Sequence, residues 1–381
     1  MNFSTSNNYP PPPGGGGGGG MGPPPGGGGG GMGPPPDFGS SMITPLQRHV
    51  ALYGYSILFI FGFFGHATTI TIFLRRTLRS VSTSCLFVCM TISDIVYLIT
   101  CFYQYIFLGL GVPTTNTSLM NLLCRIYTYI QYFSMCCTAW LLLTITIDRW
   151  LRIRFPFRVK QLCTRRRVLI GACVIVICSA LLNFHLAFPS TGVVPGSTAC
   201  AIGSSASATY QYFYSNIWPI LLTSLQIILP TIFLLGLSIN IFIRLRRQQQ
   251  QQQRLKQGRR AFLDRQMLII MLTSIFLFFI TQIPLSLFNI LMIYVLRPRL
   301  SVQQQLEFNT ISIFVASINY SASFYIHCLS SRLFRTEFFN IIHFRRNQRI
   351  GIITQMLGLE GSLTQTQIQL FQLPPTKFMK T

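Results

Sequence analysis

Long apolar stretches, separated by short polar segments rich in arginine, occupy the chain from about residue 50 to residue 328. Each stretch is longer than the roughly 20 residues that an α-helix needs to cross the hydrocarbon core of a bilayer. A helix satisfies its own backbone hydrogen bonds in lipid, so each stretch predicts a transmembrane helix. The seven predicted spans are about 50–74, 83–108, 121–151, 166–188, 212–243, 262–294 and 305–328.

The segments on either side of these spans have different compositions. Residues 1–47 are rich in proline and glycine and bury too little apolar surface to offset the entropy of ordering, so we expect a disordered tail. This tail shows no pattern of a removable signal peptide. Residues 331–344 alternate basic with apolar residues, which is typical of a short amphipathic helix on the membrane surface. Residues 345–381 would then form a tail, and the predicted fold is an all-α membrane protein, a bundle of seven transmembrane helices with a C-terminal surface helix.

Composition supports lipid as the solvent of this chain. Half of its residues are hydrophobic and only 10% are charged, whereas soluble domains carry roughly 25% charged residues. The 30 Lys and Arg residues against 7 Asp and Glu would suit a nucleic-acid binder if they formed a continuous face. They lie instead in short clusters between apolar runs, so we expect a lipid bilayer and no nucleic acid as partner.

The clusters of basic residues predict the orientation of the bundle. The first, second and third loops on one side and the C-terminal tail hold three, eight, eight and seven Lys and Arg residues, which together are 26 of the 30. The positive-inside rule assigns that side to the cytoplasm. The glycosylation sequons at Asn2 and Asn116 then lie outside the cell, as glycosylation requires. We therefore expect a multi-pass protein of the plasma membrane with its N-terminus extracellular and its C-terminus cytoplasmic.

Two of the eleven cysteines lie on the predicted outer side. Cys124 begins the third span, and Cys200 lies in the loop between the fourth and fifth spans. Disulfides persist in that compartment, and no other outer cysteine competes, so we predict a Cys124–Cys200 bridge. The alternative is a pair of free thiols. The other cysteines lie mostly within helices, where a lone cysteine behaves as a small apolar residue.

Asp94 is the acidic residue in the middle of a predicted span. An aspartate at the centre of a membrane helix costs about 3 kcal/mol on insertion scales, so it marks a functional site by default. Polar groups of Thr138, Asn319 and Ser323 on two other spans could converge with it on a sodium ion. The alternative is a structural aspartate that only hydrogen-bonds to neighbouring helices.

A second charged group stands at the predicted cytoplasmic end of the third span, in Asp148-Arg149-Trp150. The guanidinium of Arg149 could pair with Asp148 and also reach Asp264 near the start of the sixth span, which would hold the two helix ends together. Breaking this contact would release them, so we interpret the group as an activation switch. Alternatively, Arg149 is one more cytoplasmic positive charge.

Taken in order, these positions resemble the rhodopsin-like (class A) family of G-protein-coupled receptors over residues 48–344. Cys124 precedes Arg149 by 25 residues, which is the family's interval between its third-helix cysteine and the arginine of its Asp-Arg-Tyr motif. Further positions that match the family's pattern are Asp94, Pro230, Pro284, Phe278 and Asp264. The resemblance implies an extracellular ligand and a heterotrimeric G protein at the basic cytoplasmic loops.

The sequence also departs from the family pattern. His66 stands where the first helix usually has Asn, and Gln282 stands where the sixth helix usually has Trp. The seventh span reads Ser-Phe-Tyr-Ile-His over 323–327 where the family has Asn-Pro-x-x-Tyr. We align His327 with that Tyr, although Tyr325 could take its place, and include both in the switch.

The residues that match the family's ligand pocket restrict the class of ligand. All four lysines lie outside the spans, so no retinal Schiff base can form, and Gln131 replaces the acid that binds monoamines. The polar and aromatic set resembles the pockets of small neuropeptide receptors, and any single member could instead be ordinary helix packing. The set comprises Gln131, Tyr127, Tyr132, His185, Gln282, Phe288, Asn289 and Glu307. Because outer charges are sparse, we expect a small amidated peptide.

Other classes of membrane protein are less consistent with the sequence. A transporter or channel would show internal repeats or ionisable residues along a pathway, and a receptor for a non-peptide small molecule remains an alternative. An intramembrane protease needs paired aspartates or a His-Glu-x-x-His motif, whereas Asp94 and Asp148 lie at opposite levels. We therefore predict no enzymatic activity, no catalytic residues and no metal site.

Overall fold

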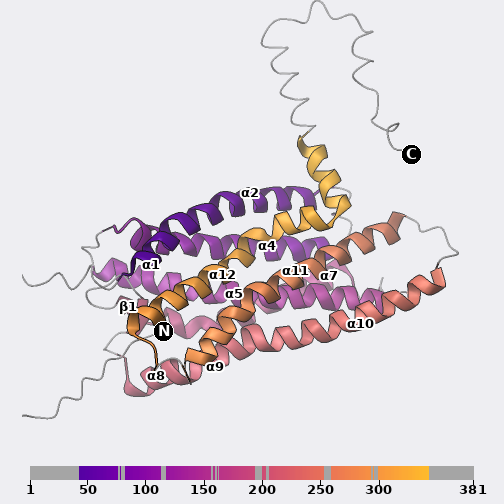
Figure 1. The fold of residues 1–381 in the computed structure, drawn as a ribbon. Helices are drawn as coiled ribbons and strands as arrows, with labels where there is room; N and C mark the ends of the chain where they lie inside the picture. The colour runs from indigo at the N-terminus through magenta and orange to yellow at the C-terminus, as the bar shows by residue number, and fades with distance from the viewer. Residues whose placement is uncertain are drawn as a thin grey trace, which may run out of the picture.

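The computed structural model describes residues 43–75, 82–112, 117–155, 163–193, 200–202, 206–252, 259–292 and 299–342, with residues 78, 158, 161 and 295. Long helices run along a common axis and form an elongated bundle (Figure 1). The predicted N-terminal tail up to residue 42, the C-terminal tail and both glycosylation sites, Asn2 and Asn116, lie outside these residues.

Seven helical rods make up the bundle. In chain order they are α1 (Pro45–His49), η1 (Val50–Gly54) and α2 (Tyr55–Phe73) as the first; α4 (Ser82–Gln104) and η2 (Tyr105–Gly109) as the second; α5 (Thr117–Arg154) as the third; α7 (Arg165–Asn183) and η3 (Phe184–Ala187) as the fourth; α8 (Ala208–Tyr212), η4 (Phe213–Ile217), α9 (Trp218–Thr223), η5 (Ser224–Ile228) and α10 (Leu229–Gln252) as the fifth; α11 (Arg259–Leu291) as the sixth; and α12 (Val302–Ser330) as the seventh. A two-stranded antiparallel hairpin pairs β1 (Thr191–Val193) with β2 (Cys200–Ile202).

Six of these rods are long and apolar enough to cross a membrane by length and composition. The seventh, α12, has 29 residues and is not among these six. Its polar side chains are buried, among them Ser317, Asn319 and His327, and it packs between α2 and α11. Polar groups that face neighbouring helices are compatible with a lipid environment, so the fold is an all-α bundle of seven membrane helices.

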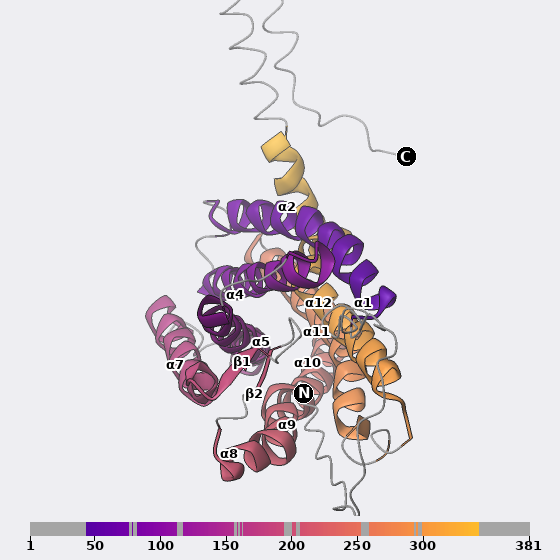
Figure 2. The same cartoon turned by 90° about the vertical axis from the view of Figure 1, so that its left-hand side faces the viewer.

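The helices differ in how much of their surface the bundle covers. The third, α5, packs against α4, α7 and α10, and residues such as Leu141 and Ile145 are almost fully buried. In the view along the bundle, α7 stands at its edge (Figure 2). Its outer face exposes Ile170, Val174 and Leu181, the last by 70%. An apolar outer face of this kind suits contact with hydrocarbon chains.

After α12 the chain turns, and residues 332–342 form a further helix that leaves the direction of the bundle (Figure 1). Phe334 is 1% exposed and packs among aromatic rings, whereas Phe339 and Ile342 on the other side are exposed. Nη1 of Arg75 lies 2.9 Å from Oε2 of Glu337. This helix thus has one face on the bundle, and its exposed positions combine Phe339 and Ile342 with polar residues such as Arg332 and Asn340.

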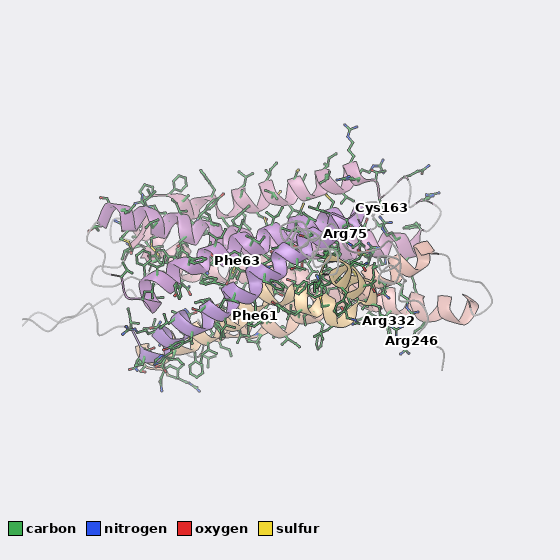
Figure 3. The ribbon with its side chains drawn as sticks, turned by 90° about the horizontal axis from the view of Figure 1, so that it is seen from above. Phe61, Phe63, Arg75, Cys163, Arg246 and Arg332 are labelled. Atoms are coloured by element: carbon green, nitrogen blue, oxygen red, sulfur yellow. A yellow bond between two sulfur atoms is a disulfide. The ribbon has the colours of Figure 1, made fainter. Side chains whose placement is uncertain are left out.

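The two ends of the bundle are chemically different, and we name them by their landmarks. The disulfide end carries the β1–β2 hairpin and Cys124; the arginine end carries Arg149 and the helix 332–342. Figure 3 shows Arg75, Cys163, Arg246 and Arg332 gathered at the arginine end, with Phe61 and Phe63 further along the bundle. There α10 and α11 extend beyond the other helices (Figure 1).

Candidate functional site

At the disulfide end, the structure joins Cys124 of α5 to Cys200 of β2 by a disulfide. Two further contacts fasten the hairpin to the same helix. The side-chain oxygen of Asn121 accepts a hydrogen bond from the backbone N–H of Val193 at 2.8 Å, and Nε of Arg125 donates to a hairpin carbonyl at 2.9 Å. The hairpin is thereby held on the end of α5 by covalent and hydrogen bonds over little more than one helical turn.

A cavity with about 1250 Å³ of empty space, including its mouth, lies between the helices. Gln131, which lines it, follows Cys124 by seven residues, or about 10 Å along a helix, so the cavity lies in the half of the bundle near the disulfide. Aromatic rings and amide side chains form much of its wall: Tyr97, Tyr132, Tyr214 and Trp218, with Gln131, Gln226, Asn289, Gln305 and Asn309. Within the described part of the chain, no Asp, Glu, Lys, Arg or His lines the cavity.

Three of the eight pocket residues predicted from the sequence line this cavity, namely Gln131, Tyr132 and Asn289. The structure does not place Tyr127 or Gln282 in the wall, because each is used in contacts within the bundle. Tyr127 accepts a hydrogen bond from Nε2 of Gln104 at 2.6 Å. Nε2 of Gln282 donates to the carbonyl of Ala316 at 3.1 Å and so ties α11 to α12.

The other three predicted pocket residues, His185, Phe288 and Glu307, also lie outside the lining. Nδ1 of His185 is 3.0 Å from the hydroxyl of Tyr210, and its ring packs edge-on against Trp218. Glu307 is partly exposed and accepts a hydrogen bond from Gln303 at 3.5 Å. Phe288 is a buried packing residue. These three predicted positions therefore lie outside the cavity that the structure shows.

Most of the wall from the fifth and seventh helices was not predicted. Trp218 and Gln226 come from the fifth helix, and Gln305 and Asn309 from the seventh. The sequence did contain a signal for Gln305 and Asn309: they are four residues apart and therefore share one helix face. Long polar side chains on one face of an apolar helix point to a polar interior.

Asp94 is 2% exposed and lies among hydroxyl groups from two other helices. Oγ1 of Thr138 donates to its Oδ1 at 2.8 Å, and Oγ of Ser323 donates to its Oδ2 at 3.5 Å. Asn319 is buried nearby on α12, but no hydrogen bond joins it to Asp94 in the described structure. Nor do the described residues contain a cluster of three His, Cys, Asp or Glu side chains able to hold a metal.

At the arginine end, Asp148 is buried and accepts hydrogen bonds from two groups. Oγ1 of Thr83 lies 2.5 Å from its Oδ2, and Nε of Arg152, one turn further along α5, lies 2.9 Å from the same oxygen. Sequence reasoning named neither partner. The guanidinium of Arg149 is 2% exposed beside this group. The predicted partner Asp264 lies in α11, but its side chain is outside the described residues.

Cys163, in the segment between α5 and α7, is buried close to the same carboxylate. Burial, together with the negative charge of Asp148, raises the pKa of its thiol to about 11. The thiol is therefore protonated at neutral pH.

In the seventh helix, His327 and not Tyr325 faces the interior. His327 is 1% exposed, and its Nε2 lies 3.0 Å from the hydroxyl of Ser274 on α11. Tyr325 is partly exposed and donates to the carbonyl of Phe61 at 3.0 Å. His66 replaces the first-helix Asn in a similar interhelical role, because its Nε2 donates to the carbonyl of Tyr320 at 2.6 Å.

The seven-helix bundle, the disulfide between its third helix and the following hairpin, and the buried arginine at the opposite end together define a class of membrane receptor. A sequence profile described as "7 transmembrane receptor (rhodopsin family)" matches residues 67–328. The chain belongs to this family.

Individual relatives are distant. "Lysophosphatidic acid receptor 6" of Mus musculus is 24% identical over 193 residues, which are 50% of this chain and 53% of that protein. "Platelet-activating factor receptor" of Cavia porcellus is 24% identical over 322 residues, 81% of this chain and 90% of that protein. "FMRFamide peptide receptor frpr-18" of Caenorhabditis elegans is 25% identical over 146 residues, 38% and 34% of the two chains. The match thus covers about half the length of the first of these proteins and about a third of the length of the last.

Proposed function

We propose that this chain is a G-protein-coupled receptor of the plasma membrane, which transmits the binding of an extracellular ligand to a heterotrimeric G protein. The observation that carries this proposal is the separation of two sites along one set of helices. The cavity lies near the disulfide end, and the Thr83–Asp148–Arg152 group with Arg149 lies at the arginine end. A ligand that changes the packing of the helices at the first site can alter the second.

The orientation that serves this function places the disulfide end outside the cell. Disulfides persist in the extracellular compartment, and the positive-inside rule assigns the arginine end to the cytoplasm. In this orientation Asn2 and Asn116 are available for glycosylation. The exposed arginines between the third and fourth helices, such as Arg165 and Arg166, supply positive charge for docking a G protein.

The proposed ligand is a small amidated peptide. Aromatic and amide side chains of the cavity wall suit the apolar side chains and the backbone of a short peptide. A C-terminal amide is uncharged, so it needs no cation in the wall, whereas burying an unpaired charge is costly. One relative is named for an amidated peptide.

A non-peptide ligand, in particular a lipid mediator, is the second candidate. Two relatives are named for lysophosphatidic acid and platelet-activating factor. The absence of Lys, Arg and His from the described cavity lining argues against a phosphate group bound there. A transporter or channel receives no support from the family to which the chain belongs.

Asp94 with Thr138, and with Ser323 at a longer distance, is proposed as a sodium site. The carboxylate and two hydroxyl groups from three helices supply the oxygen ligands that hard cations prefer. Asn319 would have to move to join them. A melting temperature of the purified receptor that is higher in sodium chloride than in potassium chloride, and equal in both for Asp94→Asn, would support the site; equal values in the wild-type receptor would rule it out.

Signalling tests the receptor function. Cells that express the chain with a reporter for G-protein activation are exposed to a library of short amidated peptides. We expect a response from the wild-type chain and, at equal surface level, a response that Arg149→Ala either strongly reduces or makes independent of ligand. Arg154→Ala removes an exposed arginine five residues further along the same helix and serves as the matched control. A wild-type dose response from Arg149→Ala would contradict the switch.

A further inference from the structure

The fifth helix builds its side of the cavity from an irregular segment. Two π-helical turns, η4 and η5, flank the single α-helical stretch α9 (Trp218–Thr223). π-Turns are rare and often occur at functional sites. Tyr214, Trp218, Thr223 and Gln226 from this segment all line the cavity.

Three of these residues hold buried polar atoms with no hydrogen-bond partner among the described residues. The atoms are Nε1 of Trp218, Oγ1 of Thr223 and Oε1 of Gln226. The residues are only 3%, 2% and 3% exposed. Asn216, on the opposite side of the same helix, instead bonds to the carbonyl of Tyr212. Buried polar groups in folded proteins are nearly always satisfied, so three unsatisfied groups in one cavity wall point to a bound group that completes them.

The chemistry of the three atoms restricts what that group can be. The indole N–H of Trp218 only donates, Oε1 of Gln226 only accepts, and the hydroxyl of Thr223 does either. Their complement must accept one hydrogen bond and donate another. A primary amide does both, through its carbonyl oxygen and its N–H₂. A carboxylate cannot donate to Oε1, and an ammonium group cannot accept from the indole.

The charge of the wall leads to the same choice. Among the described residues, the lining contains no basic side chain to neutralise a carboxylate and no acidic side chain to neutralise an ammonium group. An ion brought into this cavity would lose its hydration without gaining a counter-charge, which is costly. The wall therefore selects an uncharged polar group.

We propose that Trp218, Thr223 and Gln226 form a subsite for an uncharged primary amide, and that this group is the C-terminal carboxamide of the peptide. The assignment of the amide to a peptide rests on the proposed function. The charged N-terminus of such a peptide stays toward the mouth of the cavity, and its backbone amides face the amide side chains of Gln131, Asn289 and Gln305.

The subsite is tested with three ring probes of the same shape, 4-fluorobenzamide, 4-fluorobenzoate and 4-fluorobenzylammonium. Their binding to the purified full-length receptor in lipid nanodiscs is followed by fluorine NMR. We expect the benzamide to bind about tenfold or more tightly than either charged probe, as loss of a hydrogen-bond partner in a buried site implies. Gln226→Leu and Thr223→Val should each weaken the benzamide by about tenfold. Asn216→Leu, which removes an amide from the other face of the same helix, should leave its binding unchanged.

Trp218→Phe keeps an aromatic ring and removes only the donor, so it should weaken the benzamide and leave 4-fluorobenzylammonium, which cannot accept from an indole, unaffected. Melting temperatures separate a subsite from a structural role. Because the three polar atoms have no partner in the described structure, Thr223→Val and Gln226→Leu should melt at or above the temperature of the wild-type receptor.

Equal binding of benzamide and benzoate, or unchanged benzamide binding in Gln226→Leu, would overturn the subsite. A clear fall in melting temperature for both variants would also overturn it, because it would show that the groups are needed to hold the fold. These measurements require no signalling. A receptor that responds to amidated peptides but binds no benzamide refutes the subsite alone, whereas benzamide binding in a receptor without any reporter response refutes the proposed function alone.

Discussion

At the scale of the residue, two glycines of α2 lie where a side chain has no room. A Cβ atom on Gly62 would stand 2.5 Å from Cδ1 of Leu98 and 3.2 Å from Cβ of Ser321, and one on Gly65 would stand 2.9 Å from Cβ of Phe324. The Cβ of Phe324 moves only with the backbone of α12. Small residues allow membrane helices to approach closely, so these two positions set the distance between the first and seventh helices.

Gly65→Ala is therefore expected to destabilise the receptor by about 1–3 kcal/mol, as overpacking of a close contact does. Gly236→Ala is the matched control, because nothing lies within 4 Å of a Cβ at that position. In a helix this change is neutral or stabilises by up to about 1 kcal/mol. The apparent melting temperatures of the purified variants measure both, and equal values would show that α2 and α12 are not in tight contact.

Some of the predicted pocket residues line the cavity and others do not, and the reason is physical. A position in a helix fixes the direction of a side chain but not the partner that it finds. Gln131 and Asn289 reach the cavity, whereas Gln282 is bound to a carbonyl of α12 and Tyr127 to Gln104. These contacts depend on the three-dimensional packing of the helices, which the pattern of polar and apolar residues does not predict.

At the scale of the element, the most deeply buried aromatic contact between the helix 332–342 and the bundle is made by one side chain. Phe334 is 1% exposed and packs against the rings of Phe73 and Phe324. The Arg75–Glu337 ion pair joins a partly exposed arginine to a carboxylate whose residue is only 7% exposed. The buried ring of Phe334 and this ion pair lie on the same side of the helix, against the bundle.

Phe334→Ala is expected to cost about 3–5 kcal/mol of local stability and to raise the rate of amide hydrogen exchange throughout residues 332–342. Phe339→Ala removes an exposed ring and should change exchange little. Exchange is read by mass spectrometry on the receptor in nanodiscs. Similar increases for Phe334→Ala and Phe339→Ala would contradict this account.

The apolar spans were predictable because lipid requires each one to be a helix, but their ends were not. Helix α5 continues to Arg154 and α10 continues to Gln252, beyond the predicted limits at 151 and 243. Hydropathy marks only the part of a helix that faces hydrocarbon, and arginine and glutamine are good helix formers outside it. The π-turns of the fifth helix have no sequence signal of this kind.

At the scale of the whole molecule, charge distinguishes the two ends. Two acidic residues of the arginine end, Asp148 and Glu337, form ion pairs with Arg152 and Arg75. The remaining arginines of that end give it a strong net positive charge, which opposes its transfer across a membrane. The proposed orientation follows from this asymmetry.

An epitope tag placed before residue 1 is therefore expected to be labelled by antibody on intact cells. A tag inserted in the glutamine run 248–253 should be labelled only after the cells are permeabilised, and a tag after residue 381 serves as the second cytoplasmic position. Labelling of the glutamine-run tag on intact cells would reverse the proposed orientation of the receptor.

The polar character of α12 bears on how the chain is assembled. Among the seven helices of the bundle this one is synthesised last, and it carries buried polar side chains such as Asn319 and His327. The helices α11 and α2 have been synthesised by then. They carry Ser274, which lies within hydrogen-bond distance of His327, and His66, which bonds to the carbonyl of Tyr320. Insertion of the bundle is therefore expected to end with a helix whose polar side chains form hydrogen bonds to helices that are already in the bilayer.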